Sequence, residues 1–313
     1  RKMLEVAWWA LEDAGHTRAG LFARDSQPER RLGGVFVGLM HNDYPLFAAE
    51  ARARGELAIT ASGYWNAANR VSHLLDFQGP SMAVDTACSA SLSAVHMAVR
   101  SLQAGDCTVA IAGGVNLSLH PMKYWVLSKA GFASTDGRCR SFGEGGDGYV
   151  PGEGAGAVVL KPLVRARADG DRIHAVIRAT AVNHGGRTSG FTVPNPVAQG
   201  RLIADALARA RVAPGTVSYV EAHGTGTALG DPIEIAGLKR GFGGAGGCPI
   251  GSVKSNIGHL ESAAGIAALA KVVLQLRHGT IAPSLHAERL NPDLGIADSG
   301  FRVAIRAEPW LPA

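Results

Sequence analysis

The feature that most constrains this chain is a sharp junction between an apolar strand and a helix at residues 81–90. Residues 82–84 are apolar, and the small residues after them lead directly into a helical pattern over 89–102. The junction therefore places Cys88 at or near the start of a helix. Unpaired amides and the helix dipole favour a thiolate over a thiol at that position. We expect Cys88 to be a nucleophile.

A buried structural cysteine is the alternative interpretation, because cysteine is among the most frequently buried residue types. The context of Cys88 favours the nucleophile instead. Its neighbours Ala87, Ser89 and Ala90 are small, so they leave room for an acyl chain. They also let backbone amides approach a developing oxyanion.

Composition limits the classes of function. The net charge is +5, and the arginines are spread along the chain rather than gathered in a basic tail. Basic residues interleaved with aromatic ones are also missing from the sequence, so we expect no nucleic-acid partner. The mild positive charge would suit an acidic partner, or it is an ordinary arginine-rich surface.

The four cysteines have neither the pairing nor the spacing of a metal site. No apolar run is long enough to cross a membrane. We therefore expect a cytoplasmic protein with no metal and no membrane contact. The 41 glycines, together with abundant alanine, predict helices that pack closely against the sheet.

Strands and helices alternate along the chain, which predicts an α/β core with a parallel or mixed sheet covered on both faces. Strands are expected at 32–39, 82–84, 107–112, 155–160, 173–182, 217–221 and 250–253. Helices are expected at 1–14, 65–75, 89–102, 121–130, 164–169, 199–211, 232–242 and 262–276, with a short one within 41–55.

Two glycine-rich stretches resemble phosphate-binding loops only formally. Residues 143–148 fit the spacing GxGxxG, but no strand precedes them and no helix follows directly, so we reject a dinucleotide site. Residues 241–247 lack the Gly-Lys-Ser/Thr of a phosphate loop, and we expect a flexible connection there.

Two histidines follow predicted strands. His223 comes after the strand at 217–221, and His259 lies in the polar segment after the strand at 250–253. Ligands of α/β proteins collect beyond the carboxyl ends of strands, where Cys88 is also expected. A thiolate with two imidazoles suits acyl transfer through a thioester, because imidazole exchanges protons near neutral pH.

Three segments, 84–92, 221–234 and 252–265, resemble the signature motifs of the β-ketoacyl synthases. They are most similar to the ketosynthase domains of modular polyketide synthases, and the similarity covers almost the whole chain. The resemblance implies a thiolase-like fold of two similar α/β halves in a layered αβαβα arrangement. Residues 1–162 would carry the nucleophile and residues 163–313 both histidines.

The same resemblance implies that the family's first strand would precede Arg1 and that its closing strands would follow Ala313. The closing part carries a Phe-Gly gatekeeping and oxyanion-hole motif in that family. We therefore expect this chain to be an excerpt of a longer domain in a multidomain protein, and to fold poorly by itself.

The resemblance also implies a reaction. Cys88 would take an acyl chain from an acyl carrier protein, and His223 and His259 would promote decarboxylation of a malonyl extender and stabilise the enolate. The product would be a β-ketoacyl thioester. No cofactor would be bound by this domain, because the phosphopantetheine belongs to the carrier protein.

Further residues receive supporting roles from the resemblance. Lys254 would belong to the network around His259, and Asp231 and Glu234 would order the loop of His223. Thr225 and Thr227 would hydrogen-bond the pantetheine arm.

The acyl pocket would be lined by Ala87, Trp65 and Asn66. Three more segments, 120–124, 141–154 and 182–188, are similar to ketosynthases whose acyltransferase acts in trans. The expected partners are upstream and downstream carrier proteins, neighbouring synthase domains and a second copy of the chain. The strand at 107–112 is the predicted edge for that homodimer.

Other classes of protein fit these residues less well. A ketosynthase that only transfers acyl chains tends to lose the first motif histidine, and His223 is present. A silent chain-length subunit would lack Cys88, and a degradative thiolase would need a second catalytic cysteine with its own motif. A cysteine hydrolase needs a Cys/His pair with an orienting group, which leaves residues 254–259 unexplained.

Overall fold

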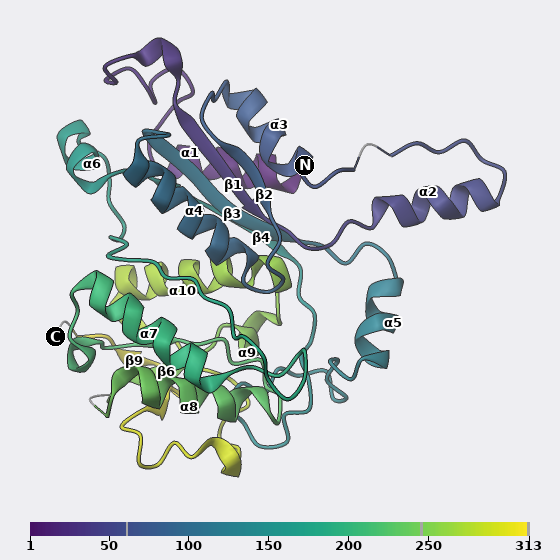
Figure 1. The fold of residues 1–313 in the computed structure, drawn as a ribbon, viewed down its shortest axis with the longest axis vertical. Helices are drawn as coiled ribbons and strands as arrows, with labels where there is room; N and C mark the ends of the chain where they lie inside the picture. The colour runs from purple at the N-terminus through teal and green to yellow at the C-terminus, as the bar shows by residue number, and fades with distance from the viewer. Residues whose placement is uncertain (61, 245–246, 312–313) are drawn as a thin grey trace. The chain divides into compact units, whose positions relative to one another are not determined.

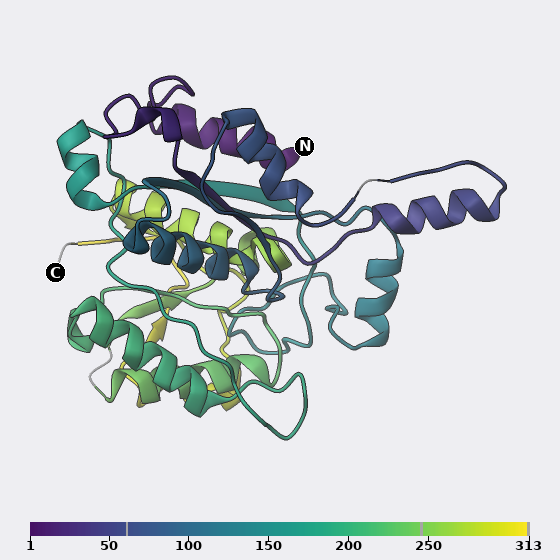
Figure 2. The same cartoon turned by 45° about the horizontal axis from the view of Figure 1, so that its top comes forward.

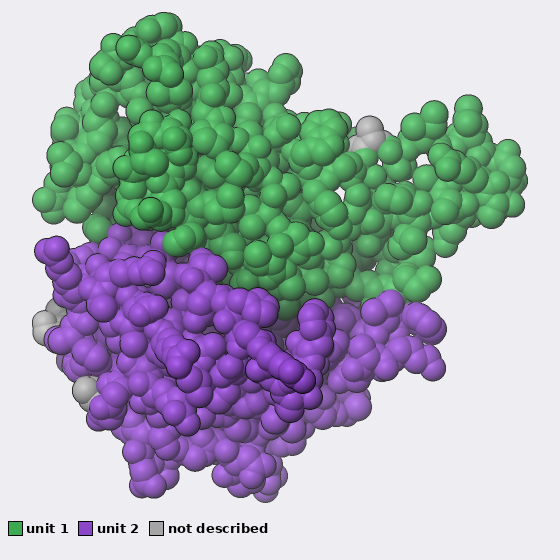
Figure 3. Space-filling model, in the orientation of Figure 1, with its two compact units in different colours: residues 1–123, 152–176, 260–267 green, residues 124–151, 177–259, 268–313 purple. Residues whose placement is uncertain are grey.

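The computed structural model describes residues 1–60, 62–244 and 247–311, so part of the glycine-rich connection predicted at 241–247 lies outside the described residues. The chain divides into two compact units, each assembled from separate stretches of sequence (Figure 3). Unit 1 comprises Arg1–Lys123, Gly152–Val176 and Leu260–Ala267. Unit 2 comprises Tyr124–Pro151, Ile177–His259 and Ala268–Ala313.

Unit 1 is built on a mixed sheet. Its strands, in spatial order, are β2 (Ser81–Val84), β1 (Gly33–Gly38), β3 (Val109–Asn116) and β4 (Gly154–Leu160). β1 runs parallel to both β2 and β3, whereas β4 runs antiparallel to β3. A parallel or mixed sheet was predicted from the alternation of elements, and the structure confirms it for this unit.

Helices cover both faces of this sheet (Figures 1 and 2). α1 (Lys2–Asp13) and α3 (Asn66–Leu75) pack on one face, and α4 (Ala90–Ala104) packs on the other. α1 buries Met3, Ala7 and Leu11, which recur every four residues and therefore form one apolar stripe. The predicted amphipathic helix at the start of the chain is confirmed.

Glycine lets α4 approach the sheet closely. A Cβ atom at Gly38, on β1, would lie 2.4 Å from the backbone nitrogen of Ser91 and 2.5 Å from the carbonyl carbon of Ala90. Ser91 in turn accepts a hydrogen bond from the Ile266 amide through its Oγ, at 3.0 Å. The close approach of helix and sheet expected from the composition is confirmed here.

Unit 2 has shorter strands. β5 (Val220–Glu221), β6 (Pro249–Gly251) and β8 (Arg302–Val303) form a parallel sheet, and β7 (Thr280–Ile281) pairs antiparallel with β9 (Glu308–Pro309). α7 (Pro196–Ala210) and α8 (Gly230–Phe242) lie side by side. The core of the unit includes Phe142, Ile235 and Ile250, each fully buried.

Further helices and 3₁₀ turns complete the two units. The α-helices are α2 (Tyr44–Ala53), α5 (Met122–Lys129), α6 (Leu163–Asp169), α9 (Lys254–Ile257) and α10 (Ala264–His278). The 3₁₀ turns are η1 (Pro28–Arg30), η2 (Pro214–Thr216), η3 (Glu261–Ala263) and η4 (Pro292–Leu294). Within the described residues, no helix combines the length and apolarity needed to cross a bilayer.

Two sequence-based predictions are wrong. Residues 173–182 form no strand, because no neighbouring segment among the described residues supplies a hydrogen-bonded ladder for them. Residues 107–112 are not a sheet edge, because β3 is paired on one side with β1 and on the other with β4. Among the described strands of that sheet, the edges are β2 and β4.

We predict that Gly38→Ala lowers the free energy of unfolding by about 1–3 kcal/mol, because the new methyl group meets backbone atoms that cannot rotate away. Urea unfolding of the full-length protein measures this change. Gly185→Ala is the matched control, since its nearest new neighbour would be Asn195 Cβ at 3.6 Å. Equal effects of the two variants would contradict the proposed close contact.

Candidate active site

The strand-to-helix junction of unit 1 is a strained turn that presents Cys88. Ala87 has φ of 50°, a left-handed conformation that is uncommon for a residue with a side chain. The turn is held by local bonds: the Ala87 amide donates to Asp85 Oδ1 at 3.0 Å, and Ser89 Oγ donates to the Thr86 carbonyl at 2.8 Å. The chain therefore turns within a few residues of β2.

Cys88 lies one residue before Ser89, the N-cap of α4, so the predicted position at a helix start is confirmed. Its side chain is half-buried, whereas Cys107, Cys139 and Cys248 are buried. Burial raises the pKa of each of those three thiols. Cys88 is thus the cysteine whose surroundings permit contact with a substrate.

In unit 2, the backbone of His223 is fixed from both sides. Its N–H donates to Glu234 Oε1 at 2.6 Å. Its carbonyl oxygen accepts from Lys254 Nζ at 2.6 Å and from Ser252 Oγ at 3.2 Å. Lys254, expected in a network around His259, thus bonds directly to the loop of His223.

Gly224 continues this loop in a conformation that needs glycine. Its φ is +46°, and a Cβ atom there would lie 2.7 Å from Ser252 Cβ. The Gly224 amide donates to Glu234 Oε2 at 2.8 Å, so one carboxylate holds two successive amides. Glu234 thereby fixes the backbone of the loop on the amide side of His223.

Asp231 supports the same loop from a buried position. Its carboxylate accepts from the amides of Phe142 at 2.6 Å and Gly226 at 3.2 Å, and the residue is 2% exposed. Burial raises the pKa of Asp231 to about 7, although the backbone amides oppose that shift. Burial also raises the pKa of Glu234. Both carboxyls thus lie in a poorly solvated environment.

His259 is buried and is held by contacts with Tyr149 and Val150. The residue is 1% exposed, its amide donates to the Val150 carbonyl at 2.8 Å, and the Tyr149 ring lies 4.8 Å from the imidazole. The rings of His223 and His259 are 5.3 Å apart and nearly perpendicular, at 85°. The structure therefore brings together the two histidines that follow β5 and β6.

The two imidazoles differ in their access to solvent. His223 is exposed, whereas His259 is buried. The Lys254 ammonium, followed by desolvation, lowers the pKa of His223 to about 3. Water screens part of this effect at an exposed ring, but the direction keeps His223 neutral at physiological pH.

The other predicted residues fall in both units. Thr225 and Thr227 place their hydroxyl oxygens 3.4 Å apart in the loop after β5, and Thr227 Oγ1 accepts from the Gly230 amide.

Trp65 and Asn66 begin α3 in unit 1, where Trp65 is 59% exposed. Cys88 and Ala87 also belong to unit 1, while both histidines belong to unit 2.

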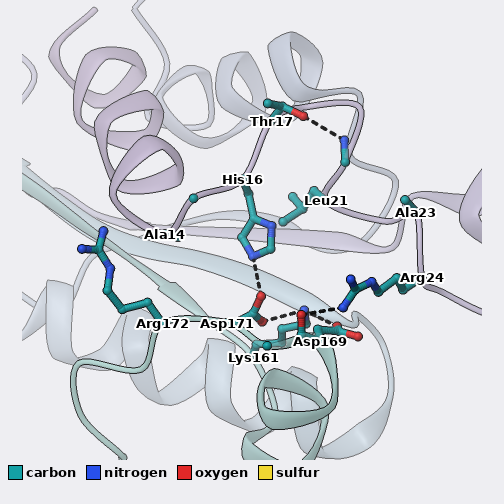
Figure 4. Close-up of a pocket in the computed structure, with 13 residues that line it drawn as sticks. Ala14, His16, Thr17, Leu21, Ala23, Arg24, Lys161, Asp169, Asp171 and Arg172 are labelled. Carbon is teal, nitrogen blue, oxygen red and sulfur yellow. Dashed lines mark hydrogen bonds and ion pairs between the residues drawn. The ribbon is translucent and has the colours of Figure 1, made fainter.

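A separate surface cavity of about 460 Å³ contains none of these residues (Figure 4). It lies in unit 1 between the end of α1 and α6. In its wall, His16 Nε2 lies 3.1 Å from Asp171 Oδ1, and Lys161 Nζ donates to Asp171 Oδ2 at 2.8 Å. His16 thus belongs to this cavity and not to the candidate active site. In the described chain, no three His, Cys, Asp or Glu side chains converge as metal ligands would.

Sequence reasoning missed several residues that support the His223 loop. Ser141 Oγ donates to the Gly224 carbonyl at 2.6 Å, and Phe142 donates its amide to Asp231. These residues lie more than 80 positions before the loop, so local patterns could not connect them. From the sequence, the segment 141–154 indicates only a subtype and a rejected GxGxxG match, not a contact with the His223 loop.

We predict that the stability contributed by Asp231 falls as pH rises. Its folded pKa of about 7 exceeds the ordinary aspartate value of 3.8, so the native state binds the proton more tightly between these values. Unfolding free energy should therefore decrease between about pH 4 and pH 7, by up to about 4 kcal/mol from this group. Asp231→Asn should remove that slope in urea titrations at several pH values; parallel pH profiles for both proteins would contradict the assignment.

Two family models match this chain. Residues 1–166 match the beta-ketoacyl synthase N-terminal domain, and residues 174–288 match the beta-ketoacyl synthase C-terminal domain. Among curated proteins, polyketide synthase ThaG of Burkholderia thailandensis is 57% identical over 99% of this chain. Polyketide synthase PksM of Bacillus subtilis is 52% identical over 99% of it.

Solved ketosynthase structures are similar to this chain in fold and in sequence. The oxazolomycin ketosynthase domain OzmH KS7 of Streptomyces albus JA3453 has a TM-score of 0.94 and 58% identity over 99% of this chain. The module 6 ketosynthase of the bacillaene synthase of Bacillus subtilis 168 has a TM-score of 0.90 and 38% identity. The chain spans 53% of each of these solved chains, and 6% and 7% of the two curated proteins. It belongs to the β-ketoacyl synthases, acyltransferases that form carbon–carbon bonds, and within them to the ketosynthases of modular polyketide synthases.

Proposed function

We propose that this ketosynthase accepts an acyl chain on Cys88 and condenses it with a malonyl thioester, with loss of carbon dioxide. The observation that supports this most directly is the pair of imidazoles of His223, after β5, and His259, after α9, with ring centroids 5.3 Å apart. A decarboxylation that yields an enolate needs donors at one carbonyl oxygen, and two imidazoles fixed together can supply them.

The proposed reaction needs no reactant besides the acyl thioester and the malonyl thioester. Cys88 first exchanges with the carrier thioester and becomes acylated. The malonyl thioester then loses its carboxylate as carbon dioxide, and the electron pair of that C–C bond forms the enolate. The enolate carbon attacks the acyl carbonyl, the C–S bond breaks, and Cys88 leaves as a thiolate. The product is a β-ketoacyl thioester on the carrier.

The electrostatics of unit 2 support this role for His223. A neutral imidazole keeps one N–H, which can donate a hydrogen bond to the developing enolate oxygen, and Lys254 favours the neutral form. The amide of Cys88, in the strained turn before α4, is positioned near a helix N-terminus, where backbone donors stabilise oxyanions. Each such donor is worth about 3–4 kcal/mol in related transition states.

The proposed reaction implies which proteins this domain would bind. Acyl carrier proteins would deliver both thioesters on their own phosphopantetheine, so the domain would need no cofactor of its own. Similarity to ThaG and PksM, together with segments 120–124 and 182–188, favours an acyltransferase that acts in trans. A homodimer that extends the sheet of unit 1 would use one of its described edge strands, β2 or β4, rather than β3. Sedimentation of the full-length protein tests the dimer.

We predict that intact-protein mass spectrometry shows the mass of one acyl group on the full-length protein after incubation with an acyl-pantetheine thioester. Cys88→Ala should show no gain, because the acceptor sulfur is gone. Cys107→Ala, which removes a buried thiol, should load like the wild type. Acylation that persists in Cys88→Ala would contradict the proposed nucleophile.

We predict that His223→Ala and His259→Ala retain loading on Cys88 but lower the rate of condensation about 10²–10⁴-fold, because each removes a hydrogen-bond donor to the enolate oxygen. A malonyl-carrier turnover assay that detects the β-ketoacyl product measures this. Full condensation in both variants would refute the role of the histidines. Wild-type loading without any condensation would favour a ketosynthase that only transfers acyl chains.

A further inference from the structure

We propose that Tyr219, Glu221 and Lys271 form a buried positioning network that sets the place of Lys254, and through it of His223, during condensation. The inference rests on the proposed function of this site, and it adds residues that do not touch the substrate. All of the residues involved belong to unit 2.

The three side chains contact one another directly. Tyr219 donates its hydroxyl to Glu221 Oε2 at 2.6 Å, and Lys271 Nζ donates to the same oxygen at 2.7 Å. Lys271 Nζ also lies 2.9 Å from the Tyr219 hydroxyl oxygen, which closes the triangle. The Glu221 and Lys271 side chains are 5% and 9% exposed. This is therefore a buried ion pair with an added phenol.

The second carboxylate oxygen of Glu221 contacts the segment that follows β6. Glu221 Oε1 accepts the Val253 amide at 2.6 Å. Val253 is the N-cap of α9, and the next residue is Lys254, whose Nζ donates to the His223 carbonyl. One carboxylate thus connects the end of β5 with the start of α9. Lys271 and Tyr219 hold the Glu221 side chain in the rotamer that this bond requires.

The sheet leaves space for this network only because β6 ends in glycine. Gly251 pairs with Glu221 in the register of β5 and β6. A Cβ atom at Gly251 would lie 2.6 Å from the Tyr219 hydroxyl oxygen and 3.4 Å from Lys271 Nζ. The network is therefore packed directly against the strand that leads to Lys254.

We expect this network to orient the Glu221 carboxylate more than it stabilises the folded protein. A buried ion pair gains little net stability over apolar residues of the same volume, because both charges lose their hydration. What it does supply is a carboxylate whose position is fixed. Burial, then the charge of Glu221, raises the pKa of Tyr219, so its hydroxyl remains a donor.

The test uses the full-length protein with carrier-bound substrates and three readouts: acylation of Cys88, the condensation rate, and the pH dependence of that rate. The variants are Lys271→Met, Glu221→Gln, and both together. Lys271→Met leaves a buried carboxylate without its cation, so Glu221 should move and release Val253. The double variant removes both charges and keeps an amide oxygen for Val253.

We expect Lys271→Met to lower the condensation rate about 100-fold, since a displacement of roughly 1 Å at a catalytic group has that effect, while loading of Cys88 stays unchanged. The double variant should recover part of the rate. The charged or titratable groups around His223 are Lys254, Glu234 and His259. When Lys254 moves away, the acid limb of the rate profile should shift to higher pH.

Lys161→Met is the matched control, because it breaks a similarly buried ion pair with Asp169 and Asp171 in unit 1. It should leave both the rate and the acid limb unchanged. Wild-type rate and pH profile in Lys271→Met would overturn the positioning network while leaving the proposed function intact. A rate loss with an unmoved acid limb and no recovery in the double variant would also overturn it. Absence of condensation by the wild type would instead contradict the proposed function.

Discussion

The clamp on the backbone of His223 is the interaction on which the candidate site depends. The residue follows a strand of only two residues, β5, in a loop that contains several glycines. Such a loop has many accessible conformations. Glu234 fixes the amide, and Lys254 and Ser252 fix the carbonyl, so the peptide units on both sides of the imidazole are held. The imidazole is thereby positioned before substrate arrives.

The same contacts set the electrostatics of the loop. The Lys254 ammonium that bonds the His223 carbonyl also disfavours a second positive charge on the ring. The carboxyls of Asp231 and Glu234 lie nearby in a poorly solvated environment, where each accepts backbone amides. Position and protonation state therefore have a common cause. A substitution that loosens the clamp should alter both together, whereas a simple loss of stability alters neither in the surviving folded protein.

Local patterns predicted the elements that carry the site, and they failed where the outcome depends on distant segments. The turn at Cys88 was predictable because β2, the small residues and α4 are contiguous. The strand expected at 173–182 was not formed, since a strand needs a neighbour and periodicity cannot say whether one exists. The edge assigned to 107–112 was wrong for the same reason. Glu221 and Lys271 are 50 residues apart, so their ion pair has no local signature.

The most direct test of the central claim is a single-turnover experiment on the full-length wild-type protein, acylated on Cys88 and then mixed with malonyl-carrier protein. Rapid quenching would follow acyl-Cys88, carbon dioxide and β-ketoacyl-carrier together. We expect each acyl-Cys88 consumed to yield one carbon dioxide and one β-ketoacyl product, at a common rate. Return of the unchanged acyl group to the carrier, without carbon dioxide, would contradict it.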